Sequence, residues 1–66
     1  MENTQENREI LARFALNVLT EAEREDITLE MYAHFLQDNK DFDRYVVLYT
    51  AALEAGMESA VAAANQ

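Results

Sequence analysis

The chain has 66 residues and a formal net charge of −8, from 13 acidic and 5 basic side chains, and it contains neither Cys nor Pro. This length allows one domain at most, so we expect a single domain over residues 1–66, with residues 1–4 and 64–66 frayed. The absence of Cys excludes a disulfide framework, and the acidic balance argues against direct binding to a nucleic-acid backbone. With a single Gly and no Pro, the composition favours an all-α fold.

The first predicted helix begins near Thr4, where Asn3 followed by Glu6 resembles a capping box. Its apolar residues recur at three- and four-residue steps, which places them on one helix face. This face consists of Ile10, Leu11, Phe14, Ala15, Val18, Leu19 and Ala22.

The end of this first helix has two interpretations. Thr20 followed by Glu23 matches a capping box and would open a new short helix. Residues 21–25 are also good helix formers and would extend the first helix. We favour the extension, which gives a helix over residues 5–24.

The second predicted helix covers residues 29–37. Thr28 is the expected N-cap, and Ile27 has the spacing to pack on Tyr32 as a hydrophobic staple. The polar stretch from residue 38 to residue 40 has the length of a turn between antiparallel helices.

The third predicted helix covers residues 42–63, with Asp41 as its N-cap candidate. Its small residues Ala52, Gly56 and Ala60 lie four apart on the main apolar face and would allow another backbone to approach closely. Alternatively, Gly56 ends the helix as a C-cap, although the helix-forming residues beyond it favour one continuous helix. A second apolar side is formed by Val47, Leu48, Ala51 and Ala55.

A second copy of the chain is the first partner that we predict. A chain this short seldom builds a sufficient core alone, and without disulfides or a metal the remaining source of stability is self-association. The three predicted helices would therefore assemble as a helical homodimer, with the third helix as the contact. The predicted interface consists of Tyr45, Tyr49, Ala52, Leu53, Gly56, Met57 and Ala60. Tyr45 and Tyr49 are equally compatible with the rim of a core whose hydroxyls reach water.

Another protein, with a basic surface, is the second predicted partner. The most acidic part of the chain lies between Glu21 and Glu30, and Met31 and Phe35 lie four residues apart on a shoulder of the second helix. Charge complementarity would bring a basic partner to this region. The predicted contact residues are Glu21, Glu23, Glu25, Asp26, Glu30, Met31 and Phe35.

Catalytic and metal-binding patterns are weak in this sequence. His34 is the single imidazole and lacks a plausible nucleophile, so we expect a surface residue. Asp38, Asp41 and Asp43 cluster around a turn but lack the Gly and Glu positions of an EF-hand loop. We therefore expect no enzyme activity, no metal and no cofactor.

Direct contact with DNA or with a membrane is also not expected. A helix-turn-helix interpretation would place Asp41 and Asp43 against phosphates at the start of the recognition helix. No stretch approaches the ~20 apolar residues of a membrane span, and residues 1–9 do not resemble a signal peptide, so we expect a cytoplasmic protein.

These features favour a small acidic helical module for protein–protein interaction, acting as a non-enzymatic regulator or inhibitor. No motif identifies a family; in size and composition the chain resembles small acidic helical proteins made by phages and other mobile elements. The alternative is a nucleic-acid mimic that occupies the basic site of a DNA- or RNA-binding protein.

Overall fold

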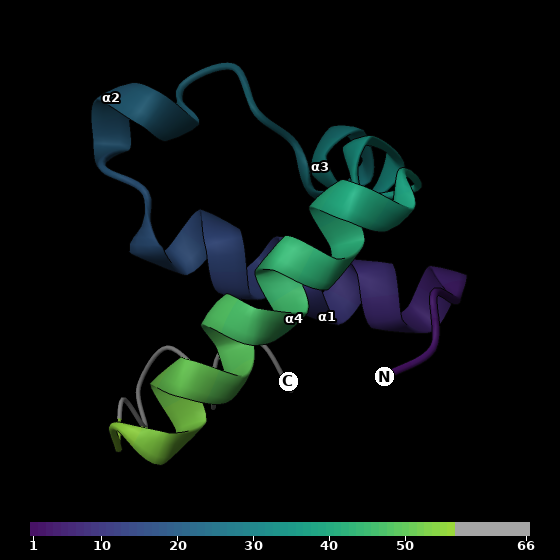
Figure 1. Ribbon diagram of the computed structural model, residues 1–66. Helices are drawn as coiled ribbons and strands as arrows, with labels where there is room; N and C mark the ends of the chain where they lie inside the picture. The colour runs from purple at the N-terminus through teal and green to yellow at the C-terminus, as the bar shows by residue number, and fades with distance from the viewer. Residues whose placement is uncertain (57–66) are drawn as a thin grey trace.

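The computed structural model describes residues 1–56, apart from the side chain of Glu21. Within this range the fold consists of four helices and no strand (Figure 1), which are α1 (Gln5–Val18), α2 (Glu21–Arg24), α3 (Leu29–Phe35) and α4 (Asn39–Glu54). The expectation of an all-α fold is confirmed for the described residues. The expectation of three helices is wrong.

Helix α1 begins at Gln5, close to the predicted start, but its cap differs from the prediction. The hydroxyl of Thr4 accepts a hydrogen bond from the backbone N–H of Asn7. The Asn3 side chain instead donates to the carbonyl oxygen of Gln37 at 3.1 Å and to Oδ1 of Asn39 at 3.0 Å. Asn3 therefore ties the start of the chain to the turn between α3 and α4.

The predicted helix over residues 5–24 is interrupted. After Val18, Leu19 has an extended backbone with φ −77 and ψ 150. Thr20 then opens α2 with a complete capping box, in which its hydroxyl accepts from the Glu23 N–H and the Glu23 carboxylate accepts from the Thr20 N–H. The interruption after Val18 leaves backbone N–H groups at the start of α2 without helical partners, and these reciprocal bonds satisfy two of them. We infer that this capping outweighs the helix propensity of residues 21–25.

Helix α3 starts at its predicted N-cap and ends two residues before the predicted boundary. Thr28 accepts a hydrogen bond from the Met31 N–H at 3.2 Å. Leu36 leaves the helical conformation at ψ 8, although its side chain is fully buried.

Helix α4 begins three residues before the predicted start at residue 42, because Asp38 rather than Asp41 is its N-cap. The Asp38 carboxylate accepts a hydrogen bond from the Lys40 N–H at 2.8 Å. Asp41 then lies in the first helical turn, where a negative charge is favoured by the helix dipole.

The continuous helix predicted through Gly56 is also wrong. Helix α4 ends at Glu54, and Gly56 adopts φ +74, the left-handed conformation that glycine reaches without strain. Residues 57–63 of the predicted helix, and the predicted frayed residues 64–66, lie outside the described residues.

The core lies where α1 packs against both α3 and α4. Leu11, Leu36 and Phe42 are its largest fully buried side chains, one from α1, one from the end of α3 and one from α4. Each contributes about 1.5–3 kcal/mol by leaving water. The remaining buried residues of the cluster are Ala12, Phe14, Ala33, Tyr49 and Ala52.

Helix α2 stands away from the other three helices, on the loop that leads from α1 to α3 (Figure 1). Within the described residues, no helix is long and apolar enough to cross a membrane.

Candidate interaction surface

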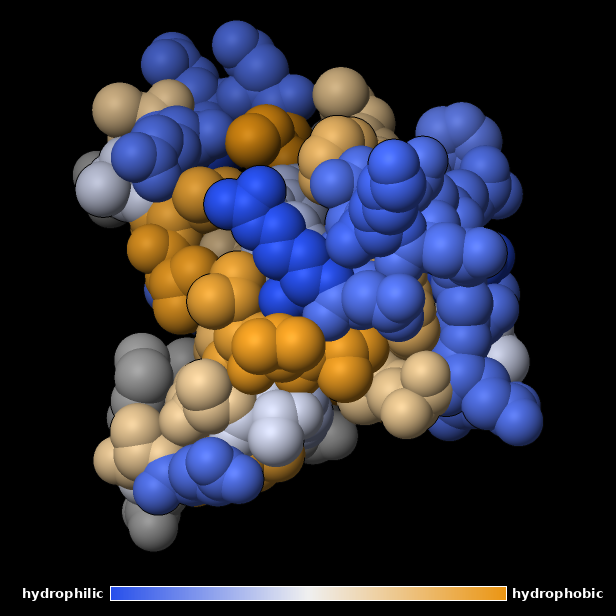
Figure 2. Space-filling view, in the orientation of Figure 1, coloured by the Kyte–Doolittle hydropathy of each residue, from blue (hydrophilic) through white to orange (hydrophobic). Residues whose placement is uncertain are grey.

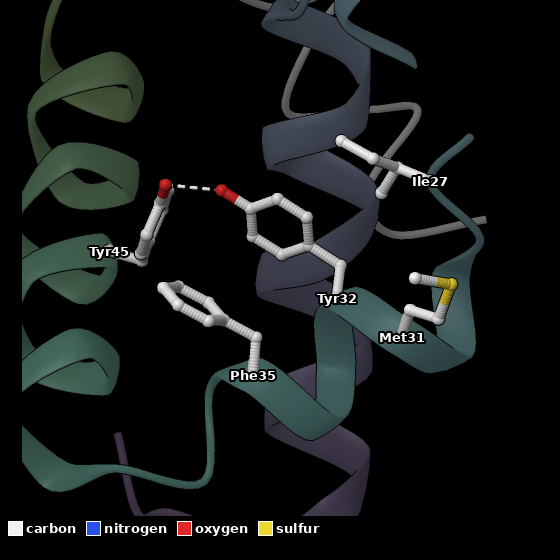
Figure 3. Close-up of a pocket in the computed structure, with 5 residues that line it drawn as sticks. All are labelled: Ile27, Met31, Tyr32, Phe35 and Tyr45. Atoms are coloured by element: carbon white, nitrogen blue, oxygen red, sulfur yellow. Dashed lines mark hydrogen bonds between the residues drawn. The ribbon is translucent and has the colours of Figure 1, made fainter. Parts of the chain in front are cut away.

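An apolar hollow of about 280 Å³ opens between α3 and α4 (Figure 3). We call it the α3 hollow; it is lined by Ile27, Met31, Tyr32, Phe35 and Tyr45. Figure 3 shows Tyr32 near its centre, with Phe35 and Tyr45 on one side and Ile27 and Met31 on the other. The predicted staple pair, Ile27 and Tyr32, therefore line the same hollow.

Aromatic contacts form the wall of the α3 hollow toward α4. The rings of Tyr32 and Tyr45 meet edge to face, with centroids 5.6 Å apart, and their hydroxyls share a hydrogen bond. Phe35 packs on Tyr32 with a centroid distance of 5.7 Å. Burial, and then the hydrogen bond with Tyr45, raise the pKa of Tyr32 above its ordinary value, so its hydroxyl stays protonated to a higher pH than that of a free tyrosine.

Met31 and Phe35 remain 59% and 52% exposed although both are large and apolar. The helical register explains this, because Ala33 and Leu36 occupy the inner face of α3 and leave Met31 and Phe35 on its outer shoulder. Scattered exposed apolar residues are common, but these two lie one helical turn apart and line one hollow. They form an apolar patch available for contact.

Exposed acidic residues precede and flank this patch. Glu23, Glu25, Asp26 and Glu30, four of the acids predicted to contact a partner, are all exposed, and the contact itself stays a prediction. The side chain of Glu21, the remaining predicted acid, is outside the described structure. Arg24 is the exposed basic residue within this segment.

A second hollow, of about 390 Å³, lies between the end of α1 and the C-terminal half of α4. We call it the α4 hollow; it is lined by Phe14, Val18, Tyr45, Leu48, Ala51, Ala52 and Ala55. Val18 and Leu48 are 51% and 47% exposed. Figure 2 shows apolar side chains gathered over α4 and the adjoining end of α1. Tyr45 lines both hollows.

The residues predicted for the dimer interface fall into different environments. Tyr49 and Ala52 are buried within the single chain, and Tyr45 is half-buried. Leu53 is 50% exposed, and Gly56 is exposed at the end of α4. Met57 and Ala60 lie outside the described residues. These placements leave the dimer itself a prediction, but Tyr49 and Ala52 already have contacts inside one chain.

Residues absent from the predicted sites line both hollows. Leu48, Ala51 and Ala55 of the α4 hollow belong to the second apolar side of the helix, which the sequence pattern indicated without assigning a contact. Val18 belonged to the predicted inner face of the first helix. Ile27 was predicted only to pack on Tyr32 as a hydrophobic staple. The periodicity of the sequence does not show whether such a residue also lines a hollow at the surface.

The described residues contain no group of three or more His, Cys, Asp or Glu that could hold a metal ion. His34 is exposed at the end of α3. Comparisons with protein-family models, with curated proteins and with solved structures gave no match.

Proposed function

We propose that this protein is a non-enzymatic interaction module, which regulates or inhibits another protein by occupying part of its surface. The observation that supports this proposal best is the α3 hollow, where Met31 and Phe35 are both more than half exposed. Methionine and aromatic side chains are enriched in protein interfaces, and methionine adapts its shape to a partner.

The packing around the α3 hollow also supports a binding role. The Tyr32–Tyr45 hydrogen bond and the edge-to-face contacts hold three of its five lining residues in place in the free protein. A preformed site loses less conformational entropy on binding than a mobile one. The hollow is therefore suited to receive side chains without rearrangement of the chain.

We further propose that the protein acts as a homodimer and that the α4 hollow is the contact. Val18 and Leu48 offer exposed apolar surface there, and the small side chains of Ala51 and Ala55 permit close approach of a second backbone. Among the described residues, no charged side chain lines this hollow, so these parts of two copies would meet there without opposing like charges. The proposed contact thus lies beside the predicted one, on the exposed side of α4.

A second candidate function is mimicry of a nucleic acid. Three exposed acids, Glu23, Glu25 and Asp26, lie close together in sequence in a chain of net charge −8, which favours attraction to a basic groove. Mimicry predicts binding that weakens strongly as salt rises and weakens further with each acid replaced by its amide.

The experiment is co-purification of a tagged copy from the native host at two salt concentrations, with the bound proteins identified by mass spectrometry. The interaction-module proposal predicts a partner retained at high salt by the wild type and lost with Met31→Ser. Recovery that is lost at high salt and is insensitive to Met31→Ser would instead favour mimicry.

A further inference from the structure

The charges around the α3 hollow indicate what kind of partner it accepts. In sequence, Asp26 directly precedes Ile27 and Glu30 directly precedes Met31, and both acids are exposed. Arg44 and Asp41 of α4 both lie close enough to Tyr32 to act on its ionisation, Arg44 lowering its pKa and Asp41 raising it. Acids thus adjoin residues of the hollow in sequence, in the loop before α3 and on α3, and α4 brings one base and one acid near Tyr32.

Basic groups do not balance these acids. Residues 23–45, which include every residue of the hollow, carry seven acidic against three basic side chains, a net charge of −4 with His34 neutral. Residues 46–56, beyond the hollow, carry only Glu54. The segment that supplies the α3 hollow is thus more acidic than the part of α4 that follows it.

The apolar ridge beside the α3 hollow favours a helix of a partner. The hollow itself has a volume of about 280 Å³. Met31 and Phe35 lie four residues apart and form a ridge along α3, with Tyr32 beside it. Ridges at this spacing pack into the grooves of another helix.

We propose that the α3 hollow binds a basic amphipathic helix of a partner protein. The helix inserts a large apolar side chain between Phe35, Met31 and Tyr45, and it places Lys or Arg side chains beside Asp26 and Glu30. This inference rests on the proposed function as an interaction module and specifies the partner of the same site. It is the helix-in-groove mode of recognition, with charge complementarity added at the rim.

Other occupants fit this hollow less well. A second copy of the chain would bring its own excess of acidic residues against Asp26 and Glu30. A nucleic acid would be repelled for the same reason and would find no basic footprint. A neutral apolar segment would fill the hollow but would leave the acidic rim without partners.

Three synthetic peptides test the proposal against the 66-residue chain, by calorimetry and by amide chemical shifts. The first is an amphipathic Lys/Leu helix, the second replaces each Leu by Ala, and the third replaces each Lys by Glu. We expect the Lys/Leu peptide alone to bind, with the largest shifts at Met31, Phe35 and their neighbours. Binding should weaken at higher salt without being abolished, because the apolar contact remains.

Matched variants locate the contact. Phe35→Ser and Met31→Ser should each weaken Lys/Leu binding at least about tenfold, as expected for anchor residues. Val47→Ser changes an exposed apolar residue that lines neither hollow, and it should leave binding unchanged within about twofold. Glu30→Gln should weaken binding at low salt, whereas Glu54→Gln should not.

Four results would overturn the proposal. The first is no binding of the Lys/Leu peptide. The second and third are binding of the Glu/Leu peptide or of the Lys/Ala peptide with the same affinity as the Lys/Leu peptide. The fourth is binding of the Lys/Leu peptide to Phe35→Ser with wild-type affinity. If peptide binding fails while a native partner is still recovered in a Phe35-dependent manner, the partner class is wrong and the proposed function stands. If Phe35→Ser and Met31→Ser each recover as much of the native partner as the wild type does, the α3 hollow is not the binding site and the proposed function fails there.

Discussion

Phe14 of α1 meets Tyr49 of α4 edge to face, with ring centroids 5.4 Å apart and planes at 85°. Both rings are buried, at 5% and 8% exposure, so the inner face of α4 is used within one chain. The large apolar residues that α4 leaves exposed are Val47, Leu48 and Leu53, on other sides of the helix. Because Tyr49 already packs on Phe14 within one chain, we place the proposed dimer surface at the neighbouring α4 hollow and not at Tyr49.

Replacing Phe14 by Leu should destabilise the fold. The change removes the aromatic pair and leaves a small cavity, for which we expect a loss of about 1–2 kcal/mol in the free energy of unfolding. Urea unfolding followed by circular dichroism measures this value. Val47→Ala is the control, because Val47 is 67% exposed, and its effect should stay within about 0.5 kcal/mol. Equal effects of the two changes would contradict the packing described for α1 and α4.

Thr28→Ala should destabilise the fold through the start of α3. The Thr28 hydroxyl accepts from the Met31 N–H, and loss of such an N-cap costs about 1 kcal/mol. Because α3 places Ala33 in the core, the loss should appear as a fall of about 4–8 °C in Tm. Thr50→Ala, an exposed change inside α4, should leave Tm unchanged or raise it. A Tm that is insensitive to Thr28→Ala would show that the cap is not needed.

The stability of the fold should decrease at high pH because of Tyr32. Its pKa is raised above the ordinary value of 10.0 by burial first and then by the hydrogen bond with Tyr45. Folding therefore favours the protonated hydroxyl, and this contribution is fully present below about pH 10 and is lost as pH rises further. The measurement is the urea midpoint of unfolding as a function of pH.

Tyr32→Phe provides the comparison for this pH dependence. Without the hydroxyl, the variant should be less stable at neutral pH by about 0.5–1.5 kcal/mol, and its stability should fall less steeply above about pH 10. Parallel curves for the wild type and the variant would rule out Tyr32 as the source.

Light scattering tests the proposed homodimer. We expect twice the chain mass at micromolar concentrations, and a Tm that rises with protein concentration. Leu48→Glu should give the monomer mass, because it places a charge in the α4 hollow. Val47→Glu adds the same charge at a more exposed neighbour that does not line that hollow, and it should remain a dimer. A wild type with the monomer mass would exclude the homodimer.

The sequence pattern predicts part of the core because helical periodicity records which side chains face inward. Leu11, Phe14 and Ala15 of the predicted apolar face of the first helix are buried, as is Ala52 of the main apolar face of the third predicted helix. The boundaries were harder to predict because they depend on competition between local hydrogen bonds and helix propensity. Thr20 shows this most clearly, since its local capping box with Glu23 opens α2 where the propensity of residues 21–25 favoured a continuous helix.

The proposed binding surfaces follow less directly from the sequence. Met31 and Phe35 were recognisable because they lie on the shoulder of an amphipathic helix next to an acidic segment. The α4 hollow was not recognisable from the sequence, because it depends on how Val18 of α1 approaches Leu48 of α4. Periodicity within each helix carries no information about that approach.

The most direct test of the interaction surface is the affinity of the native partner, once isolated, for the wild type, Phe35→Ser and Val47→Ser. An interaction module that binds through the α3 hollow should lose at least about tenfold in affinity with Phe35→Ser and retain wild-type affinity with Val47→Ser, because Val47 lines neither hollow. Equal affinity of the wild type and Phe35→Ser would contradict the assignment of this hollow as the binding site.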